Sequence, residues 1–192
     1  AYSMASAVEN EQLEFYSIVV PEGLFTPKLV NLAVGDTIFV EKRAYGFLTV
    51  ERFPQGGQLW LMASSTGICP FLAMLFDPLT WPRFEKIVLV LSVREAQDLI
   101  YQDKLNLLYE HPVFGRAVRD KFHYVTIVTR QPEPKCYQQR MTTLVEQRIL
   151  EQDLNLPITV AQTRVMVCGN PTLVKDMRSI LQARGLTLSR FS

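Results

Sequence analysis

The fold of this chain is decided by the stretch Gln58-Leu-Trp-Leu-Met-Ala-Ser-Ser-Thr-Gly-Ile-Cys-Pro-Phe-Leu-Ala-Met-Leu-Phe76. Its first part, Leu59 to Ala63, is an apolar run of strand length, and Ser64 to Gly67 is a small polar turn. From Ile68 onward the sequence favours a helix. Pro70 falls in the first helical turn, where a proline is tolerated because its missing N–H has no intrahelical partner. We therefore predict a strand, a tight turn and a helix.

A helix that begins directly after a strand can bind an anion. Its free N–H groups and the positive end of the helix dipole face the carboxyl edge of the strand. In an open parallel sheet, ligands bind at that edge. The stretch alone is equally compatible with an ordinary strand-to-helix connection. Nucleotide binding over Ser64 to Gly67 is thus a hypothesis that the rest of the chain has to support.

Composition limits the classes of function. The 192 residues suffice for one large or two small domains, and about half of them are apolar. A net charge of +1 argues against a general nucleic-acid binder, which needs a concentrated basic surface. No apolar run approaches the roughly 20 residues of a membrane-spanning helix. We expect a globular protein that binds neither nucleic acid nor membrane.

Cysteine and histidine usage points to a reducing compartment without a metal centre. Cys69, Cys136 and Cys168 are odd in number and widely spaced, which is typical of reduced thiols in a cytoplasmic protein. The only histidines are His111 and His123, and no cysteines are closely paired. A zinc or iron–sulfur site is therefore not expected.

The first 55 residues have the features of an antiparallel β domain. Glu11 to Val20 alternates and then becomes fully apolar, and Thr37 to Val40 and Phe47 to Val50 are further strand candidates. A short helix is expected near Thr26, which precedes Pro27.

Residues 56 to 192 read as a doubly wound domain. Apolar strands alternate with helical segments, which predicts a parallel sheet with helices on both faces. Beyond the opening stretch, the expected strands are Ile87–Leu91, Tyr124–Thr129 and Val165–Val167, and the expected helices are Ala96–Tyr109, Arg140–Leu150 and Pro171–Arg184.

Polar residues follow each putative parallel strand, so they would share one edge of the sheet. These tips are Ser64 to Gly67, Val93-Arg94, Thr129-Arg130 and Cys168-Gly169-Asn170. Arg140 comes shortly after Arg130. An arginine fork suits phosphate, and a ribose 2′-phosphate needs a positive, hydrogen-bonding nest. Each arginine alone could be a solvated charge, but together they predict a nucleotide phosphate site.

Several common chemistries lack their motifs. There is no Gly-x-Gly-x-x-Gly, as in common dehydrogenases, and no P-loop. No Ser-His-Asp or Cys-His constellation supports hydrolysis. Because the side chains offer few acids or bases, a cofactor is expected to supply the chemistry.

Three further candidates each have a plain alternative. Tyr2-Ser3 could stack on a planar heterocycle and donate to a ring nitrogen, or could simply pack. Gly23 to Thr26 could bind phosphate, or could be a turn with Thr26 as N-cap. The Cys168 thiol could line the approach of a nicotinamide ring, or could be a buried structural cysteine.

An ordered set of motifs runs over essentially the whole chain and resembles the bacterial ferredoxin(flavodoxin)–NADP⁺ reductases. No single motif decides this, but the set is specific. The motifs are Ala-Tyr-Ser-Met-Ala-Ser at 1–6, Leu-Glu-Phe-Tyr-Ser-Ile-Val-Val at 13–20, Gly-x-x-Thr-Pro-x-Leu at 23–29, Ser-Ser-Thr-Gly-Ile-Cys-Pro-Phe at 64–71, Val-Arg-Glu at 93–95, Val-Thr-Arg at 128–130 and Val-Cys-Gly-Asn-Pro at 167–171.

The resemblance implies a fold and an activity. It implies an incomplete antiparallel FAD-binding β-barrel in residues 1–55 and a doubly wound NADP-binding domain in residues 56–192. The activity would be electron transfer between NADP(H) and a ferredoxin or flavodoxin, through hydride transfer to FAD, by a monomer. The alternatives are the reductase module of an oxygenase or flavohaemoglobin-like system and a non-catalytic NADP-binding fragment.

The resemblance also implies roles for individual residues. The reaction centre would contain Ser3, Thr66 and Cys168. Tyr2 would stack on the flavin, and Arg130 and Arg140 would hold the 2′-phosphate. The residues implied at FAD are Tyr2, Ser3, Tyr16, Ser17, Ile18, Val19, Leu24, Phe25, Thr26 and Thr66. Those implied at NADP are Val93, Arg94, Thr129, Arg130, Arg140, Met166, Val167, Cys168, Gly169, Asn170 and Asp176.

The chain departs from the family pattern in three places. The flavin motif Arg-x-Tyr-Ser would begin one residue before this sequence, and the barrel strands before it are absent. Family members also continue past Leu188-Ser189-Arg190 into a tail that covers the flavin. Ser65 replaces a glycine of the usual Thr-Gly-Thr-Gly/Ala turn, which would strain the backbone if that position needs a positive φ.

Overall fold

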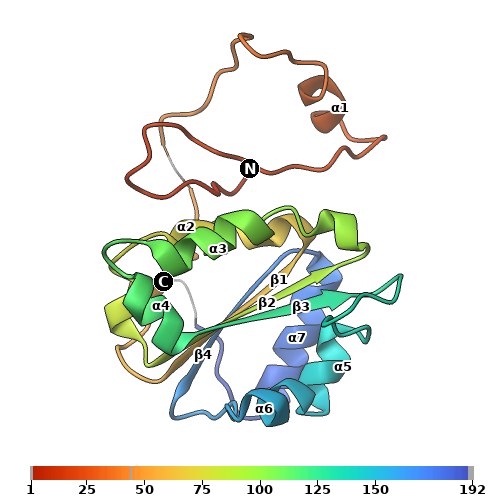
Figure 1. The fold of residues 1–192 in the computed structure, drawn as a ribbon. Coiled ribbons are helices and arrows are strands. Elements are labelled where there is room, and N and C mark those ends of the chain that lie inside the picture. The colour runs from red at the N-terminus through yellow and green to blue at the C-terminus, as the bar shows by residue number, and fades with distance from the viewer. Residues whose placement is uncertain (1, 44, 190–192) are drawn as a thin grey trace.

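A four-stranded parallel sheet organises the computed structural model, which describes residues 2–43 and 45–189 (Figure 1). Residue 1, residue 44 and residues 190–192, which the predicted domains include, lie outside the described residues. The strand order is β3-β2-β1-β4, and each neighbouring pair is parallel, as predicted. The strands are β1 (Gln58–Ser64), β2 (Lys86–Val93), β3 (Phe122–Val128) and β4 (Thr163–Cys168).

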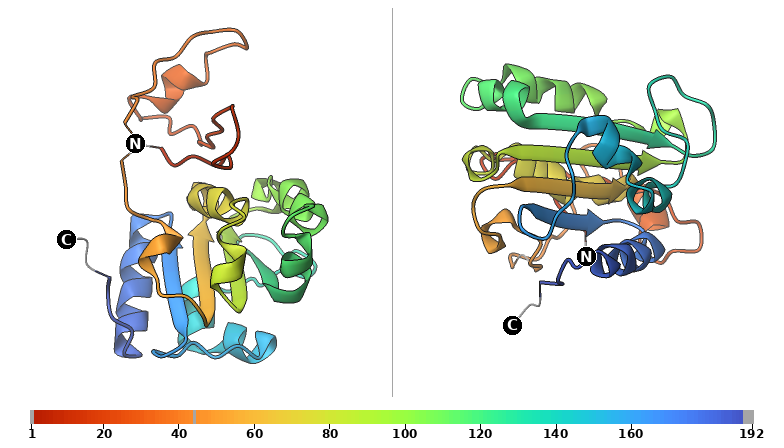
Figure 2. Two further views of the ribbon diagram at one scale, coloured as in Figure 1. Left: turned by 90° about the vertical axis from the view of Figure 1, so that its left-hand side faces the viewer. Right: turned by 90° about the horizontal axis from the view of Figure 1, so that it is seen from below.

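Helices cover both faces of the sheet, which confirms the doubly wound prediction (Figure 2). Along β1, Leu59 and Leu61 belong to one buried cluster, whereas Trp60 and Met62 belong to the other. Burial on both faces explains why β1 is apolar throughout its centre. One face is covered by α2 (Cys69–Leu75), α3 (Gln102–Glu110) and α4 (Gly115–Lys121), and the other by α5 (Met141–Glu146), α6 (Ile149–Leu154) and α7 (Pro171–Ala183).

The start and end of α7 follow the local signals in the sequence. The Asn170 side chain accepts a hydrogen bond from the Thr172 N–H at 2.8 Å, and Pro171 occupies the first helical position. After the helix, Gly185 has a φ of 87°, a conformation that favours glycine. The predicted boundaries of this helix were therefore close to the observed ones.

Two predicted helices differ from the observed ones. Residues 140–150 were expected to form one helix, but Arg148, with a left-handed φ of 58°, separates α5 from α6. Residues 96–109 begin with the short 3₁₀ turn Ala96–Asp98, and α3 starts only at Gln102. The helix α4 was not predicted.

A buried ion pair braces the side of the sheet covered by α5, α6 and α7. Arg184 donates to both carboxylate oxygens of Glu151, at 2.6 and 2.7 Å. The same two side chains bind the backbone of Ile158: its N–H donates to Glu151 at 2.7 Å, and its carbonyl accepts from Arg184 at 3.1 Å. The pair thus ties the end of α7 to α6 and to the segment before β4.

The N-terminal segment, described over residues 2–43 and 45–55, contains little regular structure, and its first part lies beyond α2 and α3 (Figures 1 and 2). Its last residues return to the sheet domain, where Arg83 donates to the carbonyls of Val50 and Phe53. The short helix α1 (Thr26–Leu29) is present as predicted, but Phe25, not Thr26, is its N-cap. Within the described part of this segment, the strands predicted for 11–20, 37–40 and 47–50 are not formed, and one antiparallel bridge joins Met4 to Phe15. The predicted partial β-barrel is therefore not shown in this chain. Strands need hydrogen-bonding neighbours, and this segment supplies too few of them.

Candidate functional site

The carboxyl ends of the four strands form one continuous edge. The parallel register pairs Ser64, at the end of β1, with Ser92 of β2. Beyond the strand ends, the Arg130 N–H donates to the Arg94 carbonyl at 2.9 Å. The Asn170 N–H donates to the Ser64 hydroxyl oxygen, also at 2.9 Å. The structure thus places the four predicted tips side by side.

The turn after β1 is held in an unusual backbone conformation. Ser65 has a φ of 48°, in the left-handed region, so the position does need the conformation that glycine adopts most easily. A Cβ on Gly67 would lie 2.2 Å from the carbonyl oxygen of Cys168. Only glycine permits this approach, which brings the turn that carries Thr66 against the tip of β4.

Cys168 sits at this junction as a protonated thiol. Its side chain is half-buried, and burial raises the pKa of the thiol, although a hydrogen bond from the Gly169 backbone opposes the shift. Burial likewise raises the pKa of the Cys69 thiol, at the start of α2. A raised pKa makes a thiolate nucleophile unfavourable at neutral pH. Cys168 can therefore shape the edge and contact a ligand, but it is not poised for covalent catalysis.

Arginine side chains lie free at the other end of the edge. Arg94 and Arg130 follow β2 and β3, and Arg140 is the N-cap residue of α5. All three are exposed, and within residues 2–43 and 45–189 their guanidinium groups make no hydrogen bond or ion pair. Free guanidinium groups can bind phosphate oxygens in a bidentate manner.

Some residues predicted for the nucleotide site lie short of the tips. Met166 is buried in the body of β4, and Val167 packs against the core on the opposite face. Asp176 is exposed on α7. The amide oxygen of Asn170 is occupied by its helix cap. The tip itself consists of Cys168 and the residues that follow it.

Three stretches predicted to contact the flavin come together in the N-terminal segment. The rings of Tyr2 and Phe25 are in contact, with centroids 5.5 Å apart. Because the bridge between Met4 and Phe15 is antiparallel, the residues before Met4 run alongside those after Phe15. Tyr2-Ser3 is therefore close to the stretch that starts at Tyr16.

The loop before α1 is fixed by Thr26. Its hydroxyl oxygen accepts a hydrogen bond from the Val20 N–H at 2.9 Å, and the residue is only 8% exposed. The Gly23 N–H donates to the Val20 carbonyl at 2.8 Å. One lone pair of the Thr26 oxygen is therefore used internally, although the hydroxyl can still donate one hydrogen bond to a ligand.

Apolar side chains around this loop are left uncovered. Leu24 is 90% exposed and Phe25 54% exposed, and Ile18 and Val19 are each about half exposed. Contiguous exposed apolar surface marks a binding site or an interface. These residues coincide with the ones implied at FAD.

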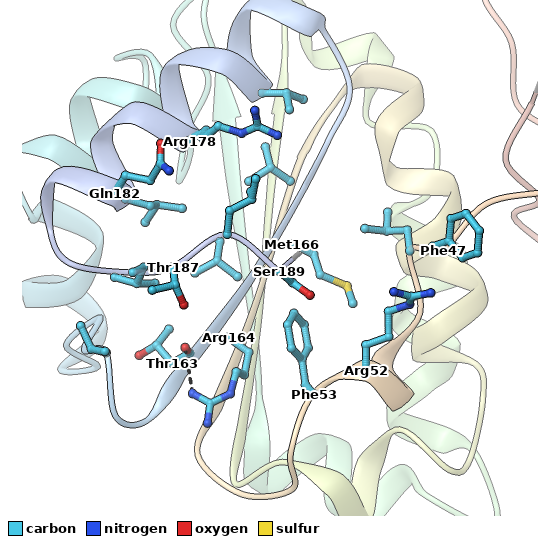
Figure 3. Close-up of a pocket in the computed structure, with 18 of the residues that line it drawn as sticks. Phe47, Arg52, Phe53, Thr163, Arg164, Met166, Arg178, Gln182, Thr187 and Ser189 are labelled. Carbon is cyan, nitrogen blue, oxygen red and sulfur yellow. Dashed lines mark hydrogen bonds between the residues drawn. The ribbon is translucent and has the colours of Figure 1, made fainter. Parts of the chain in front are cut away.

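A groove of about 620 Å³ runs along the free edge of β4 and was missed by the sequence analysis (Figure 3). Arg164 of β4 donates to the Thr163 carbonyl at 3.1 Å within it, and Arg178 of α7 and Phe53 line its walls. Of the predicted site residues, it contains only Met166 and Val167. The groove is thus a feature separate from the strand tips, and no sequence motif marks it.

An ion pair between α3 and the N-terminal segment was also missed. Lys104 and Glu14 are 90 positions apart, and their side chains are in contact. Pairing over such a separation leaves no local signal in one sequence.

The described residues show no disulfide, metal site or membrane-spanning helix. All three cysteines are free. In the described ranges, no cluster of histidine, cysteine and acidic side chains could hold a metal ion. Nor does the described part of the chain contain a helix long and apolar enough to cross a bilayer.

The sequence and fold match an oxidoreductase class. Residues 61–179, more than half of the chain, match the family described as the oxidoreductase NAD-binding domain. The chain is 42% identical to ferredoxin–NADP reductase A of Sorangium cellulosum, over 96% of this chain and 66% of that protein. It is 38% identical to the ferredoxin–NADP reductase of Pseudomonas aeruginosa, over 98% of this chain and 73% of that protein.

The fold agrees with these relatives. The crystal structure of a ferredoxin NADP⁺ reductase from Neisseria gonorrhoeae with bound FAD and NADP superposes with a TM-score of 0.88 at 34% identity, covering 98% of this chain and 74% of that one. The chain belongs to the ferredoxin–NADP reductase family, which confirms the resemblance seen in the motifs. It spans between 66% and 74% of the length of these three relatives.

Proposed function

We propose that the full-length protein is a flavoenzyme that transfers electrons between NADP(H) and a ferredoxin or flavodoxin through FAD. One observation carries the proposal: the strand tips form a single edge, with free arginines at one end and the tight contact of Gly67 with Cys168 at the other. Such an edge can bind an extended dinucleotide, phosphates at one end and reactive ring at the other. The similarity to named ferredoxin–NADP reductases supports this assignment over the reductase module of an oxygenase or flavohaemoglobin.

The residues at the edge suit NADP. Arg130 and Arg140 carry the positive charge that a 2′-phosphate requires, and neither is engaged elsewhere in the described chain. Val93, Arg94 and Thr129 complete this end of the site. We assign the nicotinamide end to the turn around Thr66 and to Cys168, whose neutral thiol adds no charge beside the ring.

The N-terminal segment suits FAD. The exposed ring of Tyr2, in contact with Phe25, offers a face on which a planar ring can stack. We assign Ser3 to a hydrogen bond near the reactive nitrogen, and Leu24, Phe25 and Thr26 to the pyrophosphate. When bound, NADPH supplies a hydride that FAD accepts and passes on as single electrons. The role of this chain is to bind and orient both groups.

The two cofactors are assigned to different parts of the chain. We propose residues 1–55 as an incomplete FAD-binding domain and residues 56–192 as the NADP-binding domain. We also propose a cytoplasmic monomer, and the three free cysteines support the reducing compartment.

A visible spectrum of the purified full-length protein tests the proposal. We expect flavin absorption bands that bleach when NADPH is added and recover when oxidised ferredoxin or flavodoxin follows. A colourless protein that still binds NADP⁺ would contradict the proposal and identify a non-catalytic nucleotide-binding module.

A further inference from the structure

One ammonium group joins the N-terminal segment to the sheet domain. Lys104, on α3, donates to the carboxylate of Glu14 and to the Ala5 carbonyl at 3.4 Å. Its Nζ also lies 5.7 Å from the ring centroid of Phe76 and 5.8 Å from that of Tyr101, within the range of cation–π attraction. Lys104 therefore contacts both parts of the chain at once.

The pair is partly shielded from solvent. The side chain of Lys104 is 24% exposed and that of Glu14 is 41% exposed. Partly buried charges are screened by salt much less than exposed ones. Cation–π attraction to the two aromatic rings restrains the ammonium group, so it samples fewer positions than a free lysine would.

Contacts also lead from Lys104 to Tyr16, which the family resemblance implies at FAD. The ammonium group of Lys104 lies over the ring of Tyr101, and burial raises the pKa of the Tyr101 hydroxyl. The Tyr101 ring packs edge-on against Tyr16, with centroids 5.6 Å apart and an angle of 82° between the planes. Lys104 thus contacts both Glu14 and Tyr101, and Tyr101 in turn contacts Tyr16.

The same lysine also fixes the extended run that carries Tyr2 and Ser3. Ala5, whose carbonyl accepts from Lys104, is buried, and its N–H donates to the Glu14 carbonyl at 2.8 Å. Both antiparallel runs, 2–5 and 14–17, are therefore anchored to α3 at one point. The ion pair between Lys104 and Glu14 links this part of the N-terminal segment to the sheet domain.

We propose that Lys104 is a positioning residue, which holds the segment that binds the flavin against the domain that binds NADP and so aligns the two reacting rings. This inference rests on the proposed function. Lys104 touches neither set of residues assigned to a cofactor directly, and acts through Glu14 and Tyr101. Misplacement of reacting groups by about 1 Å can cost roughly a hundredfold in rate, so an anchor at this point matters for the reaction.

The test uses the full-length, flavin-loaded protein and the substitutions Lys104→Met and Lys104→Arg. Methionine keeps an unbranched apolar side chain of similar length but removes the charge, whereas arginine keeps the charge. At saturating NADPH in a stopped-flow instrument, we expect Lys104→Met to slow flavin bleaching about tenfold or more. A misplacement smaller than about 1 Å accounts for a loss of that size. Flavin content and the Kd for NADP⁺ should stay close to those of the wild type, and Lys104→Arg should recover most of the rate.

Two further variants keep the proposal falsifiable. Glu14→Gln removes the other charge and should slow bleaching in the same way, which covers the case in which Lys104→Met folds poorly. Lys86→Met is the matched control, because the ammonium group of Lys86 donates to the Asp120 carbonyl at 2.9 Å, within the sheet domain. Its bleaching rate should equal that of the wild type.

The outcomes separate this inference from the proposed function. Wild-type bleaching with unchanged rates in Lys104→Met and Glu14→Gln would overturn the positioning role alone. So would a loss shared equally by Lys86→Met, or a slow rate that Lys104→Arg does not restore. A wild-type protein whose flavin NADPH cannot bleach would overturn the proposed function instead.

Discussion

The hydroxyl oxygen of Ser64 accepts a hydrogen bond from the backbone N–H of Asn170 at 2.9 Å, across 106 positions of sequence. A Cβ on Gly169 would lie 2.2 Å from the same oxygen. Together with the contact of Gly67 with Cys168, this bond locks the tips of β1 and β4 in close backbone contact. Small residues at this junction are therefore a steric requirement of the edge on which we place the nicotinamide.

The substitution Gly67→Ala tests that requirement. Its Cβ would lie 2.2 Å from the Cys168 carbonyl oxygen, so the two tips must separate. We expect the free energy of unfolding in urea to fall by about 1–3 kcal/mol, as for other overpacked sites. Gly67 has no left-handed φ, so the loss would come from the close contact and not from backbone strain. A Gly67→Ala variant as stable as the wild type would show that the close contact is unimportant.

The left-handed conformation of Ser65 predicts a stabilising substitution. A non-glycine residue at a φ of 48° costs about 1–2 kcal/mol, whereas glycine loses roughly 0.5–1 kcal/mol more conformational entropy on folding. Ser65→Gly should therefore raise the free energy of unfolding slightly, by up to about 1 kcal/mol. Ser65→Ala keeps the strain and should bring no gain. A clear loss of stability in Ser65→Gly would mean that the serine side chain makes a contact that offsets its strain.

The buried pair of Arg184 and Glu151 predicts a large effect of removing one partner. Arg184→Met leaves the Glu151 carboxylate buried, and among the described residues the Ile158 N–H is its remaining donor. Breaking a buried pair typically costs about 3–5 kcal/mol, and we expect a loss of that size in urea unfolding. Adding Glu151→Leu removes the unpaired charge and should recover part of the loss. A double variant less stable than Arg184→Met would contradict the view that the unpaired charge of Glu151 causes the loss.

His123 predicts a loss of stability toward acid pH. Burial, and secondarily the charge of Lys86, lowers the pKa of His123 in the folded protein. Near pH 6.5 the unfolded chain takes up a proton at His123, whereas the folded chain does not. The free energy of unfolding is therefore unaffected by His123 above that pH and decreases as the pH falls below it. Between pH 7.5 and 5.5, the wild type should therefore lose more stability than His123→Gln. If the free energies of unfolding of the two proteins change equally with pH, the pKa of His123 is not lowered in the folded protein.

How far the sequence predicts this structure depends on which interactions decide each element. The strand at Leu59 to Ala63 and the helix after Pro171 follow from short-range patterns, namely an apolar run and a proline start with a glycine end. The common edge of the strand tips follows from parallel topology alone. Residues such as Ser64 and Asn170 could therefore be placed together before their hydrogen bond was known.

The remaining features depend on contacts that a single sequence does not display. The break between α5 and α6 falls on Arg148, which adopts a left-handed conformation without a glycine to signal it. The strand predicted for 11–20 lacks neighbouring strands, so its apolar alternation was not enough to form one. Lys104 and Glu14 were overlooked because only tertiary packing brings them together.

Discrimination between NADPH and NADH tests the central claim most directly. The full-length double variant Arg130→Ala with Arg140→Ala should lose two charge-assisted contacts to the 2′-phosphate, each worth about 1.5–3 kcal/mol. We expect the KM for NADPH to rise about a hundredfold or more, while the KM for NADH changes little, because NADH has no 2′-phosphate. An equal rise in KM for both nucleotides would contradict the placement of NADP on this edge of the sheet.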